Sequence, residues 1–200
     1  YITKYQFLNR GIEVVDFDGT DLENLTRKNP TNKDICIGSV QACNKFFDLI
    51  EVERPKYLGY PEELEAYYDR KIWTCKFSEI TEFPVFIKPK DDVKLFTGMV
   101  IETKKDYEFV SLYYPEITPD LDVLCSGVLN FVSEYRCFVH KGELQGIHWY
   151  QGDFKLMINE SMITEIEDMI KAYKSAPIAY TLDVGLYEIN GMHWVAVVEV

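Results

Sequence analysis

The sequence has few of the features that mark zinc proteins or disulfide-bonded proteins. Its three histidines are scattered without the spacing of metal ligands, and its five cysteines are odd in number and contain no Cys-x-x-Cys pair. These shortages argue against a zinc site and a disulfide framework. Free cysteines suit a reducing compartment, so we expect a cytoplasmic protein.

Basic residues are also scarce. The 200 residues include 21 Lys and Arg against 33 Asp and Glu, which gives a net charge of -12. Such a surface repels nucleic-acid backbones and anionic membranes, although it permits one local basic pocket for a nucleotide. No apolar run approaches the ~20 residues that cross a bilayer, and no signal peptide is present. We therefore expect neither general nucleic-acid binding nor a membrane partner.

The hydrophobic content of 47% is enough for one sizeable domain or for two small lobes. Up to about residue 82, strand and helix patterns alternate. Residues 12–15 predict a short strand, Ser39 predicts a helix cap, and Pro61 marks a second helix start. We therefore predict a small mixed α/β lobe over residues 1–82.

From Phe83 onward, β-branched and aromatic residues dominate, and Asn190-Gly191 is a strong hairpin signal. One helix is indicated by an apolar stripe from Ile163 to Tyr173. The expected strands cover residues 83–88, 107–114, 121–126, 131–140, 143–150, 178–189 and 192–200. The pattern predicts an α+β fold whose second lobe, residues 83–200, is an antiparallel sheet with helices. Because the chain starts at Tyr1 and stops within a strand pattern, we expect that it is trimmed at both ends.

A lysine at the end of a predicted strand suits phosphate binding. Lys88 is followed by Pro89, and a charged loop then runs through Lys94 to Thr97-Gly98. The ammonium group would neutralise phosphate oxygens, while loop amides and a hydroxyl close over them. The alternative is an ordinary solvated, lysine-rich loop.

Two charged side chains share one face of the next predicted strand. Glu134 and Arg136 are two residues apart, so they point to the same side. Burying both in mid-sheet is costly without partners. They either pair with each other or a neighbour, or they face a ligand, with the carboxylate at ribose hydroxyls and the guanidinium at a phosphate. A lowered thiol pKa at the adjacent Cys137 would be a further possibility.

A pair of carboxylates lies on the last predicted hairpin. Asp183 and Glu199 would suit magnesium, which prefers oxygen ligands. A two-residue turn at Asn190-Gly191 pairs Asp183 with Val198 and leaves Glu199 on the opposite face. A three-residue loop, or a bulge at Gly191, places both carboxylates on one face. The magnesium site therefore predicts an odd connection at this turn.

Taken in order, these motifs resemble the ATP-grasp superfamily, and more closely its small bacterial and phage families. The resemblance covers residues 83–200, with a weaker echo in Asp69-Arg70-Lys71. It implies a nucleotide cleft between the two lobes and a set of roles. These are phosphate contacts at Lys88 and Lys94, an adenine hinge at Ser126, ribose near Glu134, the reacting phosphate near Arg136, and magnesium at Asp183 and Glu199.

The resemblance implies an ATP- and magnesium-dependent ligase. A carboxylate of a small molecule or peptide would be activated as an acyl phosphate, and an amine or thiol would then displace the phosphate. Two positions depart from the pattern. Thr181 stands where many relatives have arginine, and the asparagine expected after Glu199 would lie beyond Val200.

Two other functions remain open from the sequence. A hydrophobic run followed by Asp16-Phe17-Asp18-Gly19-Thr20 is similar to the nucleophile motif of haloacid-dehalogenase-like phosphatases, in which the first aspartate attacks phosphorus. The late acidic pair of that family is missing, and the strand-rich second half does not suit alternating α/β units. A nucleotide-binding or interaction module without catalysis is the third function.

Overall fold

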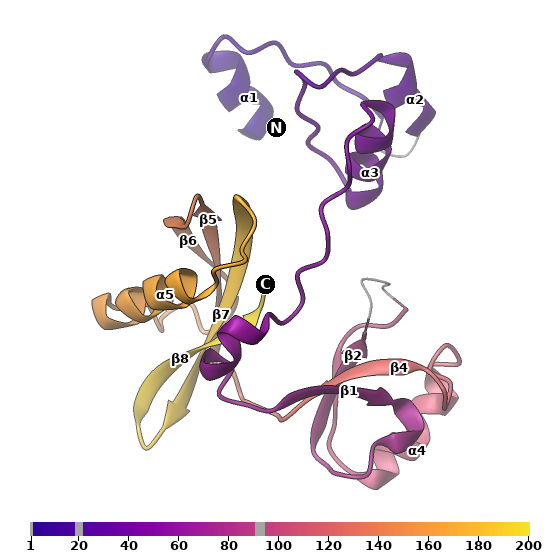
Figure 1. The fold of residues 1–200 in the computed structure, drawn as a ribbon, viewed down its shortest axis with the longest axis vertical. Helices are drawn as coiled ribbons and strands as arrows, with labels where there is room; N and C mark the ends of the chain where they lie inside the picture. Colours follow the sequence, from indigo (N-terminus) through magenta and orange to yellow (C-terminus); the bar gives the residue numbers. More distant parts are fainter. Residues whose placement is uncertain (1, 19–21, 91–94) are drawn as a thin grey trace. The chain divides into compact units, whose positions relative to one another are not determined.

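The computed structural model describes residues 2–18, 22–90 and 95–200, and the chain divides into two compact units, Tyr1–Lys56 and Tyr57–Val200. The first unit contains the helices α1 (Ile2–Asn9), α2 (Leu22–Arg27) and α3 (Val40–Leu49) (Figure 1). The predicted cap of α3 is confirmed, because Ser39 Oγ accepts a hydrogen bond from the Ala42 N–H at 3.2 Å.

The strand expected at residues 12–15 is wrong. Residues 12–18 adopt no regular structure, because no neighbouring strand in the described part of this unit supplies a ladder for an isolated apolar run. The expected boundary near Phe83 also differs from the observed one. Strand β1 (Ile72–Lys76) pairs with a strand of the second unit, so contacts divide the chain after Lys56 instead.

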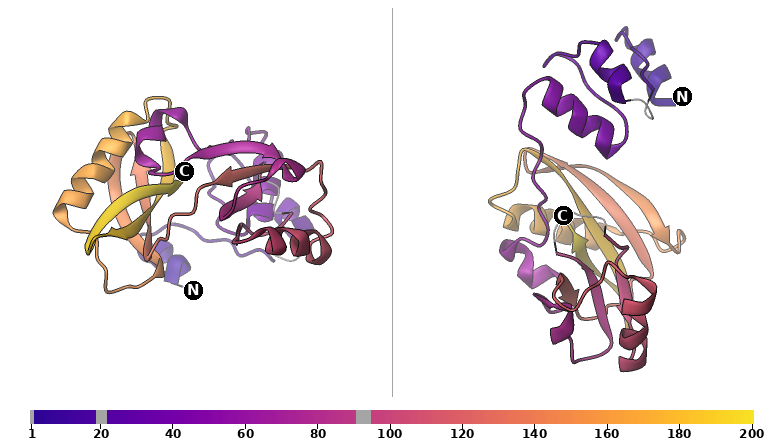
Figure 2. Two further views of the ribbon diagram at one scale, coloured as in Figure 1. Left: turned by 90° about the horizontal axis from the view of Figure 1, so that it is seen from below. Right: turned by 90° about the vertical axis from the view of Figure 1, so that its right-hand side faces the viewer.

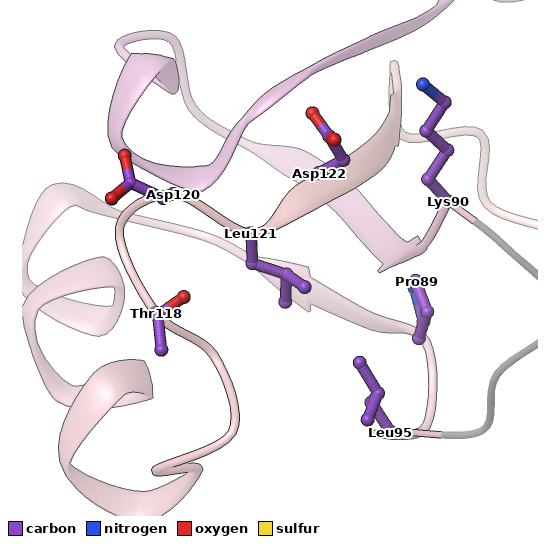
Figure 3. A pocket seen from close by; sticks show the side chains of 7 residues that line it. All are labelled: Pro89, Lys90, Leu95, Thr118, Asp120, Leu121 and Asp122. Carbon is purple, nitrogen blue, oxygen red and sulfur yellow. The ribbon is translucent and has the colours of Figure 1, made fainter.

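The second unit contains two four-stranded antiparallel sheets, which we call sheet A and sheet B (Figure 2). Sheet A has the order β1-β4-β2-β3, with β2 at Val85–Pro89, β3 at Met99–Ile101 and β4 at Asp122–Ser126. Where β2 ends and β4 begins, a hollow of about 360 Å³ is lined by Pro89, Lys90, Leu95, Thr118, Asp120, Leu121 and Asp122 (Figure 3).

Helix α4 (Lys104–Tyr113) covers most of the segment for which a strand was expected, at residues 107–114. A reciprocal capping box starts it: Thr103 Oγ1 accepts from the Asp106 N–H at 3.2 Å, and Asp106 Oδ2 accepts from the Thr103 N–H at 2.9 Å. These two bonds satisfy backbone donors that a helix end otherwise leaves unpaired. The strand prediction relied on aromatic content and overlooked this signal.

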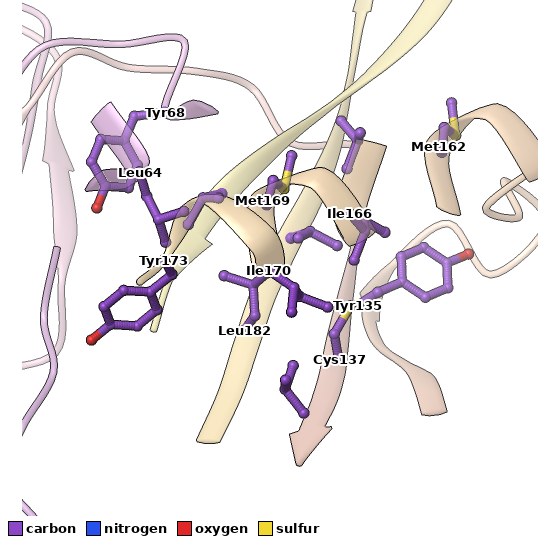
Figure 4. Close-up of a cluster of buried hydrophobic side chains, with 14 of the residues drawn as sticks. Leu64, Tyr68, Tyr135, Cys137, Met162, Ile166, Met169, Ile170, Tyr173 and Leu182 are labelled. Atoms are coloured by element: carbon purple, nitrogen blue, oxygen red, sulfur yellow. The ribbon is translucent and has the colours of Figure 1, made fainter. Parts of the chain in front are cut away.

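Sheet B has the order β6-β5-β7-β8, with β5 at Ser133–His140, β6 at Glu143–Gly152, β7 at Ala179–Ile189 and β8 at Met192–Glu199. Helix α5 (Glu160–Ala172) packs on one face through Ile166 and Met169, which are fully buried against Leu182 and Cys137 (Figure 4). The predicted helix is confirmed, although Met162 is buried where Ile163 was expected.

The two sheets, with their helices and short 3₁₀ turns η1 (Glu62–Tyr67) and η2 (Phe77–Glu79), confirm the predicted α+β class. The alternation along β5 is also as expected: Tyr135 and Cys137 face the α5 core, whereas Glu134 and Arg136 point to the other face. In the part of the chain that the structure describes, no helix is long and apolar enough to cross a membrane.

Gly185 on β7 lies directly beneath the ring of Phe131. A Cβ atom at Gly185 would come within 2.1 Å of that ring, so no other residue fits without displacing it. Gly146 on β6 is a strand glycine of the same sheet whose Cβ position has nothing within 4 Å. The two glycines therefore have opposite tolerances for a methyl group.

We expect Gly185→Ala to lower the free energy of unfolding by about 2 kcal/mol, because Phe131 must move out of its packed position. Gly146→Ala, the matched control, should be neutral or stabilise the fold by up to about 1 kcal/mol. Urea unfolding followed by tryptophan fluorescence reports on the second unit alone, because Trp73, Trp149 and Trp194 all lie within it. Equal stability of the two variants would contradict the packing of Phe131 on Gly185.

Candidate functional site

A row of charged side chains crosses the face of sheet B that points away from α5. Asp183 on β7 is the register partner of both Arg136 on β5 and Glu199 on β8. Arg136 donates to both carboxylate oxygens of Asp183, from Nε at 2.8 Å and from Nη2 at 2.6 Å. The Asp183 side chain is only 4% exposed, so this bidentate pair compensates the cost of burying its charge. The hydrogen bonds to Asp183 raise the pKa of Arg136 above its usual range.

Sheet A contributes a second cation to this row. Lys88 Nζ, at the end of β2, donates to Glu199 Oε2 at 2.7 Å and lies 4.7 Å from the centre of the Tyr60 ring. Burial of Lys88 opposes its charge, but Tyr60 and the hydrogen bond from Lys88 to Glu199 outweigh it and raise the lysine pKa. Lys88 therefore stays protonated. We call Lys88, Glu199, Asp183 and Arg136 the charged row.

The pairing of Asp183 with Glu199 comes from a bulge that the sequence did not reveal. The turn at Asn190-Gly191 is a plain two-residue turn with φ of 54° and 79°, so the odd connection expected there is wrong. Val184 instead pairs with Val197 and Asp183 with Glu199, which leaves Val198 without a partner. This β-bulge shifts the parity by one residue and places both carboxylates on one face.

Arg70 holds this bulge in place. Its Nη1 donates to the Val197 carbonyl at 2.7 Å and its Nη2 to the Val198 carbonyl at 2.9 Å. The guanidinium carbon lies 5.3 Å from the centre of the Phe131 ring, which rests on Gly185. Burial lowers the pKa of Arg70. The sequence offered only a weak signal for Arg70, in the run Asp69-Arg70-Lys71.

Tyr150 on β6 is a site residue that the sequence interpretation missed. Its hydroxyl donates to Glu134 Oε2 at 2.7 Å, and its ring centre lies 5.4 Å from the guanidinium carbon of Arg136. Burial, followed by the hydrogen bond to Glu134, raises the pKa of Tyr150. No sequence spacing connects Tyr150 with Arg136, because a register shift in β6 brings it there.

The remaining predicted site residues lie in or beside sheet A. Ser126 ends β4, is 3% exposed, and donates from Oγ to the Gly127 carbonyl at 3.0 Å. Thr97 and Gly98 are exposed just before β3, and a Cβ at Gly98 would come within 2.6 Å of the Phe86 ring. Lys94 lies outside the described residues. The structure thus brings together Lys88, Arg136, Asp183 and Glu199, with Glu134 joined to Arg136 through Tyr150.

The donor set suits a hard cation that is shared with a nucleotide. Among the described residues, no three His, Cys, Asp or Glu side chains are placed to hold a metal ion by themselves. Asp183 and Glu199 nevertheless provide two neighbouring carboxylates, and magnesium commonly uses one or two carboxylates together with substrate phosphates. The residues present therefore fit magnesium bound with a nucleotide. Cys137 does not have the lowered pKa suggested by its position, because burial raises its pKa to about 12.

The phosphatase motif lacks the setting that its chemistry needs. Asp16 and Asp18 lie in an exposed, irregular segment of the first unit, and Asp16 accepts a hydrogen bond from Lys4. The strand that should present the first aspartate is not formed, and Gly19 and Thr20 lie outside the described residues. The comparison with curated proteins found no significant match.

Several solved structures are similar to this chain, all at low identity. D-alanine–D-alanine ligase from Bacillus anthracis has a TM-score of 0.46 at 12% identity, covering 66% of this chain and 51% of that one. N5-carboxyaminoimidazole synthetase from Staphylococcus aureus has a TM-score of 0.45 at 13% identity, covering 67% and 40%. An ADP complex of N5-carboxyaminoimidazole ribonucleotide synthetase has a TM-score of 0.52 at 11% identity, covering 94% and 58%.

The chain thus spans about half the length of the ligases that it matches. A family model described as an ATP-grasp domain, the second family of its clade, matches residues 67–200, which include the whole charged row. This match covers more than half of the sequence and extends over both sheets. The chain belongs to this family of ATP-grasp domains, and so to the ATP-grasp superfamily.

Proposed function

We propose that this protein is an ATP- and magnesium-dependent ligase that joins a carboxylate to an amine or thiol through an acyl phosphate. The observation that carries the proposal is the charged row. Lys88 comes from sheet A, Asp183, Glu199 and Arg136 come from sheet B, and they form two adjoining ion pairs. A set of two cations and two carboxylates matches the charges that a magnesium-bound triphosphate presents.

In this proposal the row exchanges its partners when nucleotide binds. Lys88 leaves Glu199 for a phosphate oxygen, and Arg136 turns toward the reacting group. Asp183 and Glu199 then hold magnesium, which supplies charge neutralisation at the phosphates. No carboxylate is left uncompensated, because each one exchanges one cation for another.

The roles assigned to the surrounding residues complete the nucleotide site. Glu134 would accept hydrogen bonds from ribose hydroxyls, and Ser126 would lie at the adenine hinge. The loop through Lys94, Thr97 and Gly98 would close over the phosphates with its amides and a hydroxyl. The hollow at the end of β2 lies beside this loop, since Pro89, Lys90 and Leu95 line it (Figure 3).

The chemistry follows from positioning. An oxygen of the substrate carboxylate attacks the γ-phosphorus, the bond to the bridging oxygen breaks, and ADP leaves. The nucleophile then attacks the acyl carbon and phosphate departs. The protein's own contribution is to orient the carboxylate and stabilise charge through Lys88 and Arg136. We place the substrates among small molecules or peptides and the enzyme in the cytoplasm, which its free cysteines support.

The direct test is calorimetric titration of ATP in the presence of magnesium. We expect Lys88→Ala and Asp183→Asn each to weaken binding about 10- to 100-fold, because each removes a charge-assisted contact. Lys171→Ala is the control, since Lys171 is exposed and pairs only with Asp168 on α5. Unchanged affinity in both site variants would disprove the nucleotide site. Binding without ADP release on adding carboxylates and amines would instead indicate a nucleotide-binding module.

A second test concerns the bulge. Arg70→Met removes the donors to Val197 and Val198, so the ladder should relax to regular pairing and turn Glu199 to the other face. We expect affinity for magnesium-bound ATP to fall about tenfold. Deleting Val198 in the Arg70→Met background pairs Asp183 with Glu199 in a regular ladder, so it should restore most of the affinity. Lys71→Met is the control, and failure of the deletion to restore binding would contradict this role of Arg70.

A further inference from the structure

The cross-strand row that contains Asp183 extends beyond Arg136 to a histidine. His148 on β6 is the register partner of Arg136, so His148, Arg136, Asp183 and Glu199 stand side by side on the four strands of sheet B. Directly opposed residues of antiparallel strands point to the same face. Tyr150, two residues along β6, confirms the direction, since it bonds to Glu134 and lies over Arg136.

The imidazole of His148 has a defined orientation. Its Nδ1 lies 2.6 Å from the carbonyl oxygen of Trp149. A carbonyl oxygen only accepts hydrogen bonds, so Nδ1 carries the proton. In the neutral ring, Nε2 is then the nitrogen with a free lone pair. His148 is exposed, so Nε2 is accessible to a substrate.

The sheet surface beside His148 is open. Phe138, two residues along β5 from Arg136, is 47% exposed although it lies on an interior strand. Its partner on β6 is Gly146, whose Cβ position has nothing within 4 Å. A substrate can therefore lie on Phe138 with its reacting end between Arg136 and His148.

We propose that His148 Nε2 is the proton acceptor for the amine that attacks the acyl phosphate. This inference rests on the ligase function proposed above. Along the row, Lys88, Glu199 and Asp183 serve the phosphates and Arg136 serves the group that reacts. His148 lies at the opposite end from Lys88, on the side from which the second substrate approaches.

The proton and bond changes of this step balance. The amine nitrogen forms a bond to the acyl carbon, and the bond from that carbon to the phosphate oxygen breaks, so phosphate leaves with the electron pair. The proton lost by nitrogen moves to Nε2 and passes from the exposed imidazolium to water. The charged groups around His148 are the Arg136–Asp183 ion pair and Glu134, with the Tyr150 hydroxyl beside them. The imidazole therefore faces an ion pair and not an uncompensated guanidinium.

The first experiment measures the tautomer. Nitrogen-15 NMR of the labelled 200-residue chain resolves its three histidines, and His148 is assigned by its loss in His148→Asn. We expect the proton on Nδ1 and an unprotonated Nε2 in the neutral form. A neutral ring protonated on Nε2 would overturn the proposal, because that nitrogen then has no lone pair to offer.

The second experiment compares two nucleophiles in His148→Asn, whose amide N–H can still donate to the Trp149 carbonyl. The twenty amino acids serve as carboxylate probes, with glycinamide or hydroxylamine as nucleophile at neutral pH. Glycinamide must lose a proton as it reacts, whereas hydroxylamine is a far weaker base and a strong nucleophile. We expect amide formation to fall about 100-fold and hydroxamate formation to stay within about threefold of wild type. His193→Asn, on the β7–β8 turn, is the matched control and should behave as wild type.

The outcomes separate this inference from the ligase function. Equal rates for both nucleophiles in His148→Asn, whether both fall or neither falls, would overturn the role of His148 alone. Calorimetry should show unchanged binding of magnesium-bound ATP in His148→Asn. A wild-type chain that binds no nucleotide, or releases no ADP with any carboxylate probe, would overturn the ligase function and this step with it.

Discussion

Arg70 and the bulge at Val198 determine which side chains share the face of sheet B. In a regular ladder, Val198 would oppose Asp183 and Glu199 would oppose Leu182, which is fully buried in the α5 core. An unpaired carboxylate there would cost several kcal/mol or more. The guanidinium of Arg70 instead binds the two carbonyls at the bulge and turns Glu199 outward to Lys88. Because side chains alternate with a period of two, this one extra residue decides whether the charged row exists.

The charged row also joins the two sheets of the second unit. Lys88 belongs to sheet A and Glu199 to sheet B, so their ion pair ties the end of β2 to the end of β8. Lys88 is only 14% exposed and Asp183 only 4%, so neither charge is stable there without its partner. Such pairs contribute little net stability, but they hold opposite charges ready for a ligand with the same pattern. Recognition of a magnesium-bound phosphate then requires exchange of partners and little movement of the backbone.

Local signals in the sequence were reliable where they described a single element. The helix cap at Ser39, the stripe of α5 and the hairpin at Asn190-Gly191 all depend on residues close together in the chain. The errors arose where composition was given more weight than local chemistry or partners. The aromatic segment after Thr103 is a helix because a capping box starts it. The apolar run at residues 12–15 forms no strand because, in the part of its unit that is described, no other strand lies beside it.

The sequence by itself determined the α+β class, the order of the motifs and the identity of Lys88, Glu134, Arg136, Asp183 and Glu199 as candidates. It determined these because residue type and short-range spacing carry their chemistry. Only the tertiary structure decided that four of them meet. It also added Arg70, Tyr150 and His148, which reach the site through strand register and through contacts between distant segments. Register depends on a bulge fixed by a side chain 127 residues away from the carbonyl it binds, and no local pattern records such a contact.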